Sequence, residues 1–150
     1  MGNSSDIRRI GKATAALDGI YWNISKLSGV KENLFWLFYV LDDGEFHTQK
    51  QICDDWLFPK TTINTLIKEC EADGYITLQA IPGRKRELQI CLTDKGQAYA
   101  KKVMKSVYEI ENRALSVALE KCSPTFIADL ELFTSELQSA FENYKHTERE

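Results

Sequence analysis

Hydrogen-bond donors and cations gather between residues 59 and 93, and they are the strongest chemical signal in the chain. The first part of this stretch, PKTTINTLIKECEADG, places threonine, asparagine and lysine side chains at helical spacing. The second part contains PGRKR at residues 82–86, a turn with three cations. Short polar donors suit contacts to base edges, and cations suit contacts to phosphates, so these residue types point to DNA binding.

A single helix accounts for the first part of the stretch. Its apolar residues recur at i, i+3, i+4 and i+7, which predicts one buried face and one polar face. The apolar residues are Ile63, Leu66, Ile67 and Cys70, and the polar ones are Thr61, Thr62, Asn64, Thr65 and Lys68. Pro59 suits the helix start, where its missing N–H is not needed, and Gly74 suits the left-handed position that ends the helix.

Two strands joined by the cationic turn follow this helix. Apolar and polar residues alternate in both strands, which is typical of a half-buried hairpin. The apolar positions are Ile76, Leu78 and Ala80 in the first strand and Leu88, Ile90 and Leu92 in the second. A polar-faced helix beside a hairpin with a cationic tip predicts a winged helix-turn-helix, in which the helix enters the major groove and the tip reaches phosphates or the minor groove.

The segments before this unit are expected to support it. A first helix over residues 6–27 has Ser5 as its N-cap. A second helix, over residues 31–41, is apolar nearly all round, so it should lie at the centre of the core. Residues 45–47 are a candidate for a small strand that pairs with the hairpin.

A third helix completes the helix-turn-helix. Thr48 and Gln51 have the spacing of a capping box, and the helix should end near residues 57–58. The residue before Pro59 is pushed toward an extended conformation, which forces a tight turn. Two short helices joined in this way form the helix-turn-helix motif.

Two long helices follow the hairpin. One runs from Thr93, its N-cap, to about Lys121, the other restarts at Ser123 and Pro124, and residues 146–150 should fray. In each of these two helices and in the first helix, apolar residues recur every three or four positions and form a continuous apolar stripe, or seam, along one face. These three seams have more apolar surface than a single winged helix covers. The economical solution is a symmetric dimer in which these helices interlock. The seam residues expected at the dimer interface are Ile10, Leu17, Ile20, Ile24, Val107, Ile110, Phe133, Leu137 and Phe141.

Composition and charge limit the class of protein. A chain of 150 residues, 43% hydrophobic and 27% charged, indicates one globular domain over 1–150. We expect a cytoplasmic protein with no membrane partner, because no signal peptide is recognised and the apolar run at 34–41 is too short to span a bilayer. The net charge of −3 opposes DNA binding, but residues 59–93 carry five basic and four acidic side chains, and a local basic surface is sufficient.

Catalysis, metal binding and disulfides are not expected. The four cysteines form no C-x-x-C pair and there are two histidines, so the thiols should be free and no metal site is predicted. The chain has no Gly-rich phosphate loop and no convincing Ser/His/Asp or Cys/His set, so we expect no cofactor and no enzymatic activity. His47 lies near Asp42, Asp43 and Glu45 in sequence, and a surface histidine is the favoured interpretation.

The order of these elements resembles the MarR family of bacterial transcriptional regulators over about residues 6–145. The string PKTTINTLIKECEADGYI is similar to the family's recognition helix, and GRKRELQICLTDKG is similar to the return strand of the wing and the helix after it. The resemblance implies a mainly α fold with a small β-hairpin wing. Residues 31–93 would form the winged helix-turn-helix lobe, and residues 6–28 and 94–145 the dimerisation helices.

The resemblance also implies which residues contact DNA. They are Lys60, Thr61, Thr62, Asn64, Thr65 and Lys68 on the recognition helix and Arg84, Lys85 and Arg86 on the wing. Arg86 matches an arginine that commonly enters the minor groove. The family often has an aspartate two residues earlier, where this chain has Arg84, so the ion pair within the wing is lost and the tip gains a cation.

Many members of the family bind small aromatic compounds in a cleft between the dimerisation helices and the DNA-binding lobe, whereas others oxidise a cysteine in the first helix or bind metal. This chain has no cysteine before Cys53, so a small aromatic effector is the default. Trp22, Trp36 and Tyr39 are candidates to line such a cleft, although core packing is the favoured role of each.

The leading hypothesis is therefore a homodimeric, sequence-specific repressor that binds double-stranded DNA at a pseudo-palindromic operator and is released by a small-molecule effector. The two recognition helices would be held roughly 34–36 Å apart. The alternative hypothesis is a winged-helix protein-interaction module without sequence-specific DNA binding.

Overall fold

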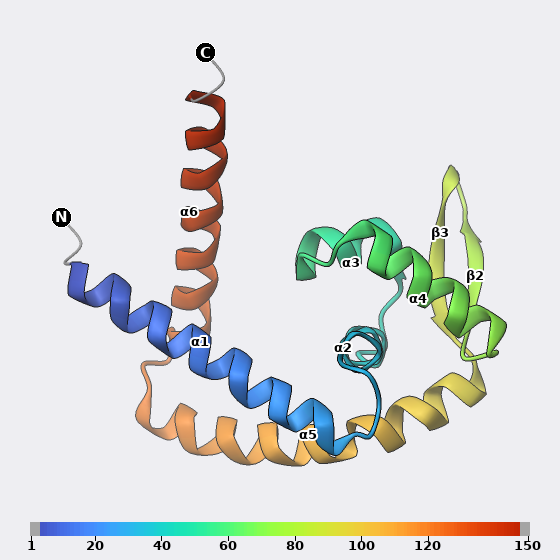
Figure 1. The fold of residues 1–150 in the computed structure, drawn as a ribbon, viewed down its shortest axis with the longest axis horizontal. Helices are drawn as coiled ribbons and strands as arrows, with labels where there is room; N and C mark the ends of the chain where they lie inside the picture. Colours follow the sequence, from blue (N-terminus) through green and yellow to red (C-terminus); the bar gives the residue numbers. More distant parts are fainter. Residues whose placement is uncertain (1–3, 148–150) are drawn as a thin grey trace. The chain divides into compact units, whose positions relative to one another are not determined.

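A computed structural model describes residues 4–147, which form six α-helices and three β-strands. In chain order these are α1 (Ser4–Leu27), α2 (Glu32–Leu41), β1 (His47–Thr48), α3 (Gln49–Trp56), α4 (Lys60–Ala72), β2 (Ile76–Ile81), β3 (Arg84–Leu92), α5 (Asp94–Lys121) and α6 (Phe126–Thr147) (Figure 1). The chain divides into two compact units, Met1–Glu109 and Ile110–Glu150, with the boundary inside α5. The predicted fold, mainly α with a small β-hairpin wing, is confirmed.

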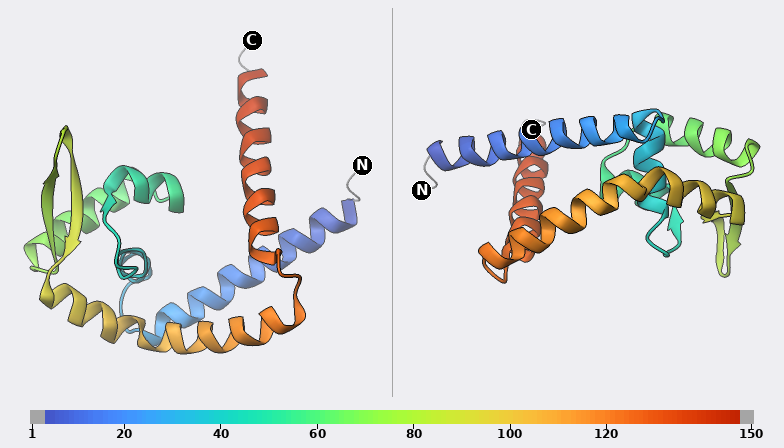
Figure 2. Two further views of the ribbon diagram at one scale, coloured as in Figure 1. Left: turned by 180° about the vertical axis from the view of Figure 1, so that it is seen from behind. Right: turned by 90° about the horizontal axis from the view of Figure 1, so that it is seen from below.

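The helix α2 lies at the centre of the first unit, between α4 and the first half of α5 (Figure 2). Phe35, Leu37 and Phe38 on this helix are fully buried, which fits its nearly continuous apolar sequence. Burying an aromatic or leucine side chain contributes roughly 1.5–3 kcal/mol, so this short helix supplies much of the core. Residues from α1, α3, α4, β2, β3 and α5 belong to the same core; they include Ile52, Ile63, Ile76, Ile90 and Met104.

The helix-turn-helix is fixed by local signals at both of its helices. Thr48 and Gln51 form the predicted capping box, with Gln51 N–H donating to Thr48 Oγ1 at 3.1 Å and Thr48 N–H donating to Gln51 Oε1 at 2.8 Å. Leu57 ends α3 in the left-handed region with φ 52°, which is a rare conformation for a leucine. This residue reverses the chain sharply, and Pro59 then occupies the N-cap position of α4.

Gly74 ends α4 as predicted, and the structure shows that it does so in a Schellman motif. The N–H of Gly74 donates to Glu71 O at 3.0 Å and the N–H of Tyr75 donates to Cys70 O at 2.9 Å. Gly74 has φ 74°, a conformation that glycine adopts without steric cost. The motif directs the chain from α4 straight into β2.

The three strands form one antiparallel sheet in the order β1-β3-β2. The predicted small strand is present, although it is His47 and Thr48 that pair, opposite Ile90 and Gln89. The prediction of a five-residue cationic turn was wrong. Ile81 pairs with Arg84, so the turn is only Pro82-Gly83 and residues 84–86 belong to β3.

The start of α5 is joined closely to the end of α4. Thr93 Oγ1 accepts a hydrogen bond from Gly96 N–H at 3.0 Å, which confirms Thr93 as the N-cap. The same hydroxyl donates to Gly74 O at 2.7 Å. Gly96 is needed at this point, because a Cβ there would lie 1.9 Å from the carbonyl oxygen of Tyr75.

Several predicted boundaries differ from the structure by a few residues. Ser5 lies inside α1 rather than preceding it. The last helix begins at Phe126, two residues after Pro124. In the tail that was expected to fray, His146 and Thr147 belong to α6, and residues 148–150 lie outside the described residues.

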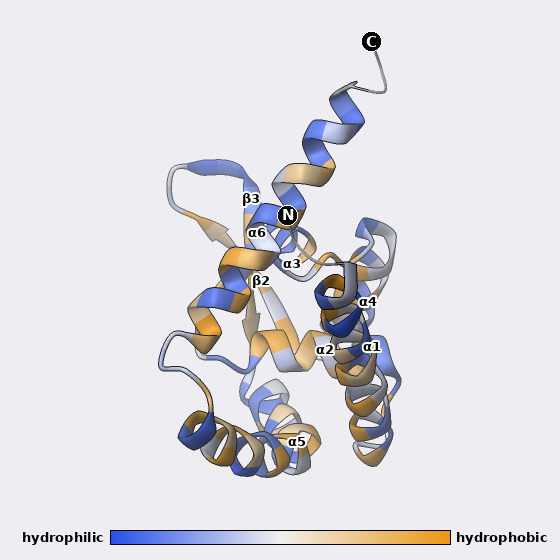
Figure 3. Cartoon of the chain, turned by 90° about the vertical axis from the view of Figure 1, so that its left-hand side faces the viewer, coloured by the Kyte–Doolittle hydropathy of each residue, from blue (hydrophilic) through white to orange (hydrophobic). Residues whose placement is uncertain are grey.

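The long helices leave most of their apolar side chains exposed. The whole of α6 has no buried residue, although hydrophobic and hydrophilic segments alternate along it (Figure 3). Ile24 and Val107, two of the seam residues, are buried in the core of the first unit, whereas Leu17, Ile20 and Leu137 are more than half exposed. No helix within residues 4–147 is long and apolar enough to cross a membrane.

Candidate nucleic-acid interface

The polar face of α4 is accessible along its whole length. Ile63, Leu66 and Ile67 point into the core, and this packing turns the opposite side of the helix to solvent. Lys60, Thr61, Asn64, Thr65 and Lys68 are exposed, and Thr62 is half-buried. The helix therefore presents an exposed row of hydrogen-bond donors and acceptors, the kinds of group that can read base edges.

One of these side chains is held by its own helix. The hydroxyl of Thr65 donates to the carbonyl oxygen of Thr61 at 3.1 Å. A hydroxyl that donates back into the helix still has its lone pairs available, so Thr65 can accept a hydrogen bond from a base amino group.

The wing carries its three cations on β3, beside α4. Arg84, Lys85 and Arg86 are all exposed. The guanidinium of Arg84 forms an exposed ion pair with the carboxylate of Glu87, at a distance of 2.8 Å. Among residues 4–147, Lys85 and Arg86 form no ion pair, so their charges are the ones available to phosphates.

The structure adds α3 to the candidate surface. A hollow of about 380 Å³ lies between α3, the start of α4 and the wing. Its lining includes Gln49 and Lys50 from the first turn of α3, together with Lys60 and Arg86. Sequence analysis missed Gln49 and Lys50, although their position at the start of the first helix of the motif was a signal that could have found them.

A second hollow next to α4 brings in the start of α2. Lys31 and Asn33 line it opposite Thr61, Thr62 and Thr65. Its volume is about 370 Å³. The lysine lies 29 residues before the recognition helix, so only the fold reveals that it is a neighbour of the polar face.

The histidine near the acidic turn is in contact with a carboxylate four residues before it. His47 Nε2 lies 2.9 Å from Asp43 Oδ2. Burial raises the pKa of Asp43, but hydrogen bonds from His47 and from the N–H of Glu45 outweigh it, and the net pKa lies below its usual value. Within the described residues no group of three or more His, Cys, Asp or Glu side chains is placed to hold a metal ion.

The four thiols are free, and two of them lie in environments that suppress reactivity. Burial, with the nearby carboxylates of Asp73 and Glu69, raises the pKa of Cys70 to about 11. Burial also raises the pKa of Cys91, although a hydrogen bond with Gln89 opposes this. Both thiols are therefore protonated at neutral pH and poor nucleophiles.

Aromatic side chains gather where α1, α2 and α3 meet. The ring of Trp36 lies 5.2 Å from that of Tyr21, 5.4 Å from that of Tyr39 and 6.3 Å from that of Trp56. Trp22 lies apart from this cluster, half exposed, with Lys26 Nζ 3.0 Å from its ring centroid. Trp36 and Tyr39 thus pack against the core, which is the role favoured from the sequence.

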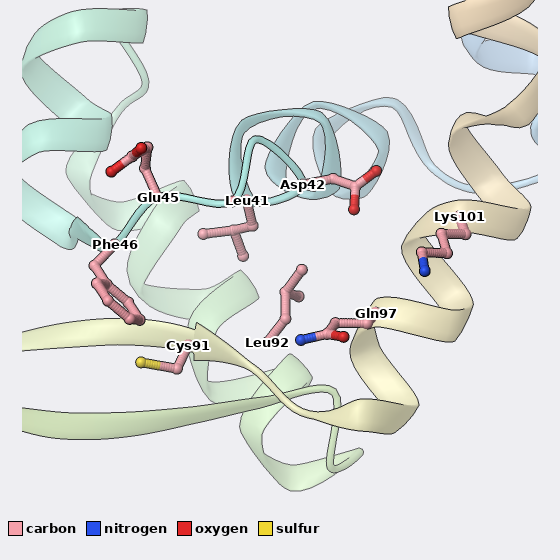
Figure 4. A pocket seen from close by; sticks show the side chains of 9 residues that line it. Leu41, Asp42, Glu45, Phe46, Cys91, Leu92, Gln97 and Lys101 are labelled. Atoms are coloured by element: carbon pink, nitrogen blue, oxygen red, sulfur yellow. The ribbon is translucent and has the colours of Figure 1, made fainter.

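Another hollow lies behind the wing, away from α4. Figure 4 shows the loop after α2, the end of β3 and the first turns of α5 around it. Its volume is about 310 Å³, with Leu41 and Leu92 near its centre and Gln97 and Lys101 on the α5 side. None of the predicted DNA-contacting residues lines it.

An exposed polar helix, a preceding capped helix and an adjacent β-hairpin define the class of winged helix-turn-helix proteins. The MarR family model matches residues 35–87, which contain all of α3, α4 and β2. This match, over about a third of the chain, makes the chain similar to the MarR family, which agrees with the sequence resemblance. No curated protein matches the chain.

Solved structures share the fold over nearly the whole chain. NMB1585, a MarR family regulator from Neisseria meningitidis, has a TM-score of 0.79 and 22% identity, and the alignment covers 93% of this chain and 98% of that one. A putative MarR family transcriptional regulator from Listeria monocytogenes, complexed with 26mer DNA, has a TM-score of 0.58 and 24% identity, covering 95% and 89%. NadR in complex with 4-hydroxyphenylacetate has a TM-score of 0.67 and 13% identity, covering 91% and 94%.

Proposed function

We propose that this protein is a sequence-specific DNA-binding transcriptional regulator. The observation that carries the proposal is the position of the exposed polar face of α4 beside a wing whose Lys85 and Arg86 form no ion pair within residues 4–147. Donors on α4 would read base edges in the major groove, and the wing cations would hold phosphates or enter the minor groove. The similar Listeria monocytogenes protein, crystallised in complex with 26mer DNA, supports this use of the fold.

The regulator acts as a homodimer in this proposal. Residues 1–150 work as one domain, in which 31–93 form the DNA-binding lobe and 6–28 with 94–145 form the dimerisation region. A helix of 22 residues with no buried side chain, such as α6, gains little stability from its own chain. The exposed apolar residues of α1, α5 and α6 would become buried against a second copy, which would place two recognition helices about 34 Å apart on a pseudo-palindrome.

The proposed mode of action is repression that a small aromatic effector relieves. A dimer bound at a promoter blocks access to it, and an effector that binds the DNA-free state better shifts the population away from the operator. The complex of NadR with 4-hydroxyphenylacetate supports an aromatic compound as the effector class.

The test is fluorescence anisotropy with labelled duplexes at two salt concentrations. One duplex is taken from upstream of the protein's own gene, a second is selected from a random library by the protein itself, and a scrambled duplex is the control. Tight binding to the selected duplex that weakens steeply with salt supports the proposal. Absence of binding at low salt to all three duplexes contradicts it and favours a protein-interaction module.

A further inference from the structure

Leu57, at the turn between α3 and α4, combines two properties that are unfavourable for a leucine. Its φ of 52° and ψ of 32° lie in the left-handed region, where the Cβ atom crowds the following carbonyl oxygen. Among residues 4–147 it is the one non-glycine residue with positive φ. Its side chain is also 76% exposed, the largest exposed fraction among the large hydrophobic residues of that range.

The fold of this turn does not require a leucine side chain. Phe58, the next residue, is half-buried and packs against the hydrophobic core, whereas Leu57 is not part of that core. Glycine adopts the left-handed conformation without steric cost, and asparagine adopts it more readily than leucine does. Strained residues of this kind cluster at functional sites, so the exposed side chain is best explained by contact with another molecule.

The position of Leu57 adjoins the surface proposed for DNA. It precedes Lys60, the first residue of α4, by three positions, so the two Cα atoms are at most roughly 11 Å apart. The N-terminal residues of a recognition helix are the ones that contact base edges in the major groove. The turn therefore adds an exposed apolar side chain next to the polar donors at the start of α4.

We infer that Leu57 contacts the methyl group of a thymine in the bound operator. The C5 methyl of thymine is the apolar feature that base pairs present in the major groove, and it distinguishes thymine from the other bases. The two δ-methyl groups of a leucine can cover it, which the polar side chains of α4 cannot do as well. The inference rests on the proposed function, because it names a base that the same interface reads.

The test uses the full chain and the duplex that it selects from a random library. In a series of duplexes, each thymine in turn and its symmetry mate in the other half-site are replaced by deoxyuridine, which lacks the methyl group and keeps the same base-pairing edge. Fluorescence anisotropy gives the Kd of each duplex. For the wild-type protein we expect one position in each half-site at which every methyl group lost raises Kd about fourfold, the effect of exposing one CH₂-sized group.

The decisive variant is Leu57→Asn, because asparagine keeps the left-handed conformation and removes the apolar group. We expect L57N to bind the unmodified duplex about fourfold more weakly for each half-site. It should be indifferent to deoxyuridine at that one position and respond as the wild type does at the others. The slope of log K against log salt should not change, because no phosphate contact is lost.

Phe46→Asn is the matched control. Phe46 is 66% exposed, and it lines the hollow behind the wing rather than the surface proposed for DNA. The control variant should therefore keep the wild-type Kd and the wild-type response at every deoxyuridine position. A loss of the same response in F46N would overturn the assignment to Leu57.

The outcomes separate this inference from the proposed function. If L57N responds to every deoxyuridine duplex as the wild type does, the inference fails and the proposed function stands. If the wild-type chain selects no duplex, the proposed function fails and the inference fails with it. We expect L57N to melt at or above the wild-type temperature, and a clear decrease would assign Leu57 to packing within its own chain. A monomeric L57N in light scattering, where the wild type is dimeric, would assign it to a contact between copies, and either result overturns the inference.

Discussion

The carboxylate of Glu87 lies 2.8 Å from the guanidinium of Arg84 on the same strand of the wing. The resemblance to the MarR family implies an aspartate two residues before Arg86, whereas this chain has Arg84 there, and Arg84 pairs with Glu87. In this pair the charge of Arg84 is neutralised by that of Glu87. Arg86 forms no ion pair within residues 4–147. In the proposed complex the wing would therefore offer DNA two cations that form no ion pair within residues 4–147, Lys85 and Arg86.

Removing the acid of this pair should strengthen DNA binding. Glu87→Gln releases Arg84 for a phosphate, so we expect higher affinity for selected and scrambled duplexes alike. The slope of log K against log salt should become steeper by about 0.9 for one added phosphate contact. Stability should change by less than about 1 kcal/mol, because the pair is exposed. Glu136→Gln on α6 is the control with the same charge change, and an equal gain from it would refute the role of the wing.

Substitutions in the wing and in the recognition helix should affect DNA binding differently. The first should weaken binding to every duplex, and the second mainly binding to the selected duplex. Arg86→Ala should weaken binding to all duplexes and lower the salt slope by about 0.9, because it removes a phosphate or minor-groove contact. Asn64→Ala should cost about 1–3 kcal/mol on the selected duplex and little on the scrambled one, because Asn64 would read a base. Lys101→Ala controls for charge lost elsewhere. Unchanged affinity of R86A for the selected duplex would remove Arg86 from the interface.

The sequence predicted those parts of the candidate interface that depend on residues close together in the chain. It predicted less well the part that depends on pairing between two strands. Thr48 with Gln51, Pro59 and Gly74 each act within one helical turn, and all four behave as the sequence indicated. The wing tip differs because pairing of Ile81 with Arg84 draws residues 84–86 into β3, with a register shift at Ala80/Ile81. No local propensity encodes that shift.

The seams show a related limit of sequence analysis. A repeat of three and four residues predicts an apolar face but not what covers it. In α1 the same face passes from exposed Leu17 and Ile20 to buried Ile24. In α5 it passes from buried Val107 to exposed Ile110. The covered ends lie in the core of the chain itself, and the exposed ends are what the proposed dimer must bury.

Gly96 should be essential for stability. Gly96→Ala places a methyl group 1.9 Å from the backbone oxygen of Tyr75, and backbone atoms cannot move aside cheaply. We expect a loss of at least about 2 kcal/mol in the free energy of unfolding, measured by urea titration. Gly19→Ala is the matched control, because nothing lies within 4 Å of its Cβ position and it is inside α1. It should gain about 0.5–1 kcal/mol, and a similar loss for both variants would refute the steric explanation.

Thiol labelling should separate the cysteines into two pairs. With a pKa of about 11, only about one Cys70 side chain in 1,000 is ionised at pH 8, and Cys91 is also buried. Cys53 and Cys122 are half-buried and should react first with a disulfide reagent such as DTNB. Mass spectrometry of peptides identifies the labelled sites. Raising the pH from 8 to 10 should accelerate Cys70 labelling in the folded protein, and rapid labelling of Cys70 at pH 7 would contradict the burial.

The dimer should depend on the exposed face of α6. Leu137→Glu puts a charge where the proposal buries an apolar side chain, so the dissociation constant of the dimer should rise about 100-fold or more. Gln138→Glu adds the same charge one residue along, off the seam, and should leave the dimer intact. Light scattering coupled to size-exclusion chromatography measures the mass of each. Monomeric L137E should also lose affinity for the selected duplex, since two half-sites no longer bind together. A dimeric L137E would show that α6 is covered by something other than a second copy.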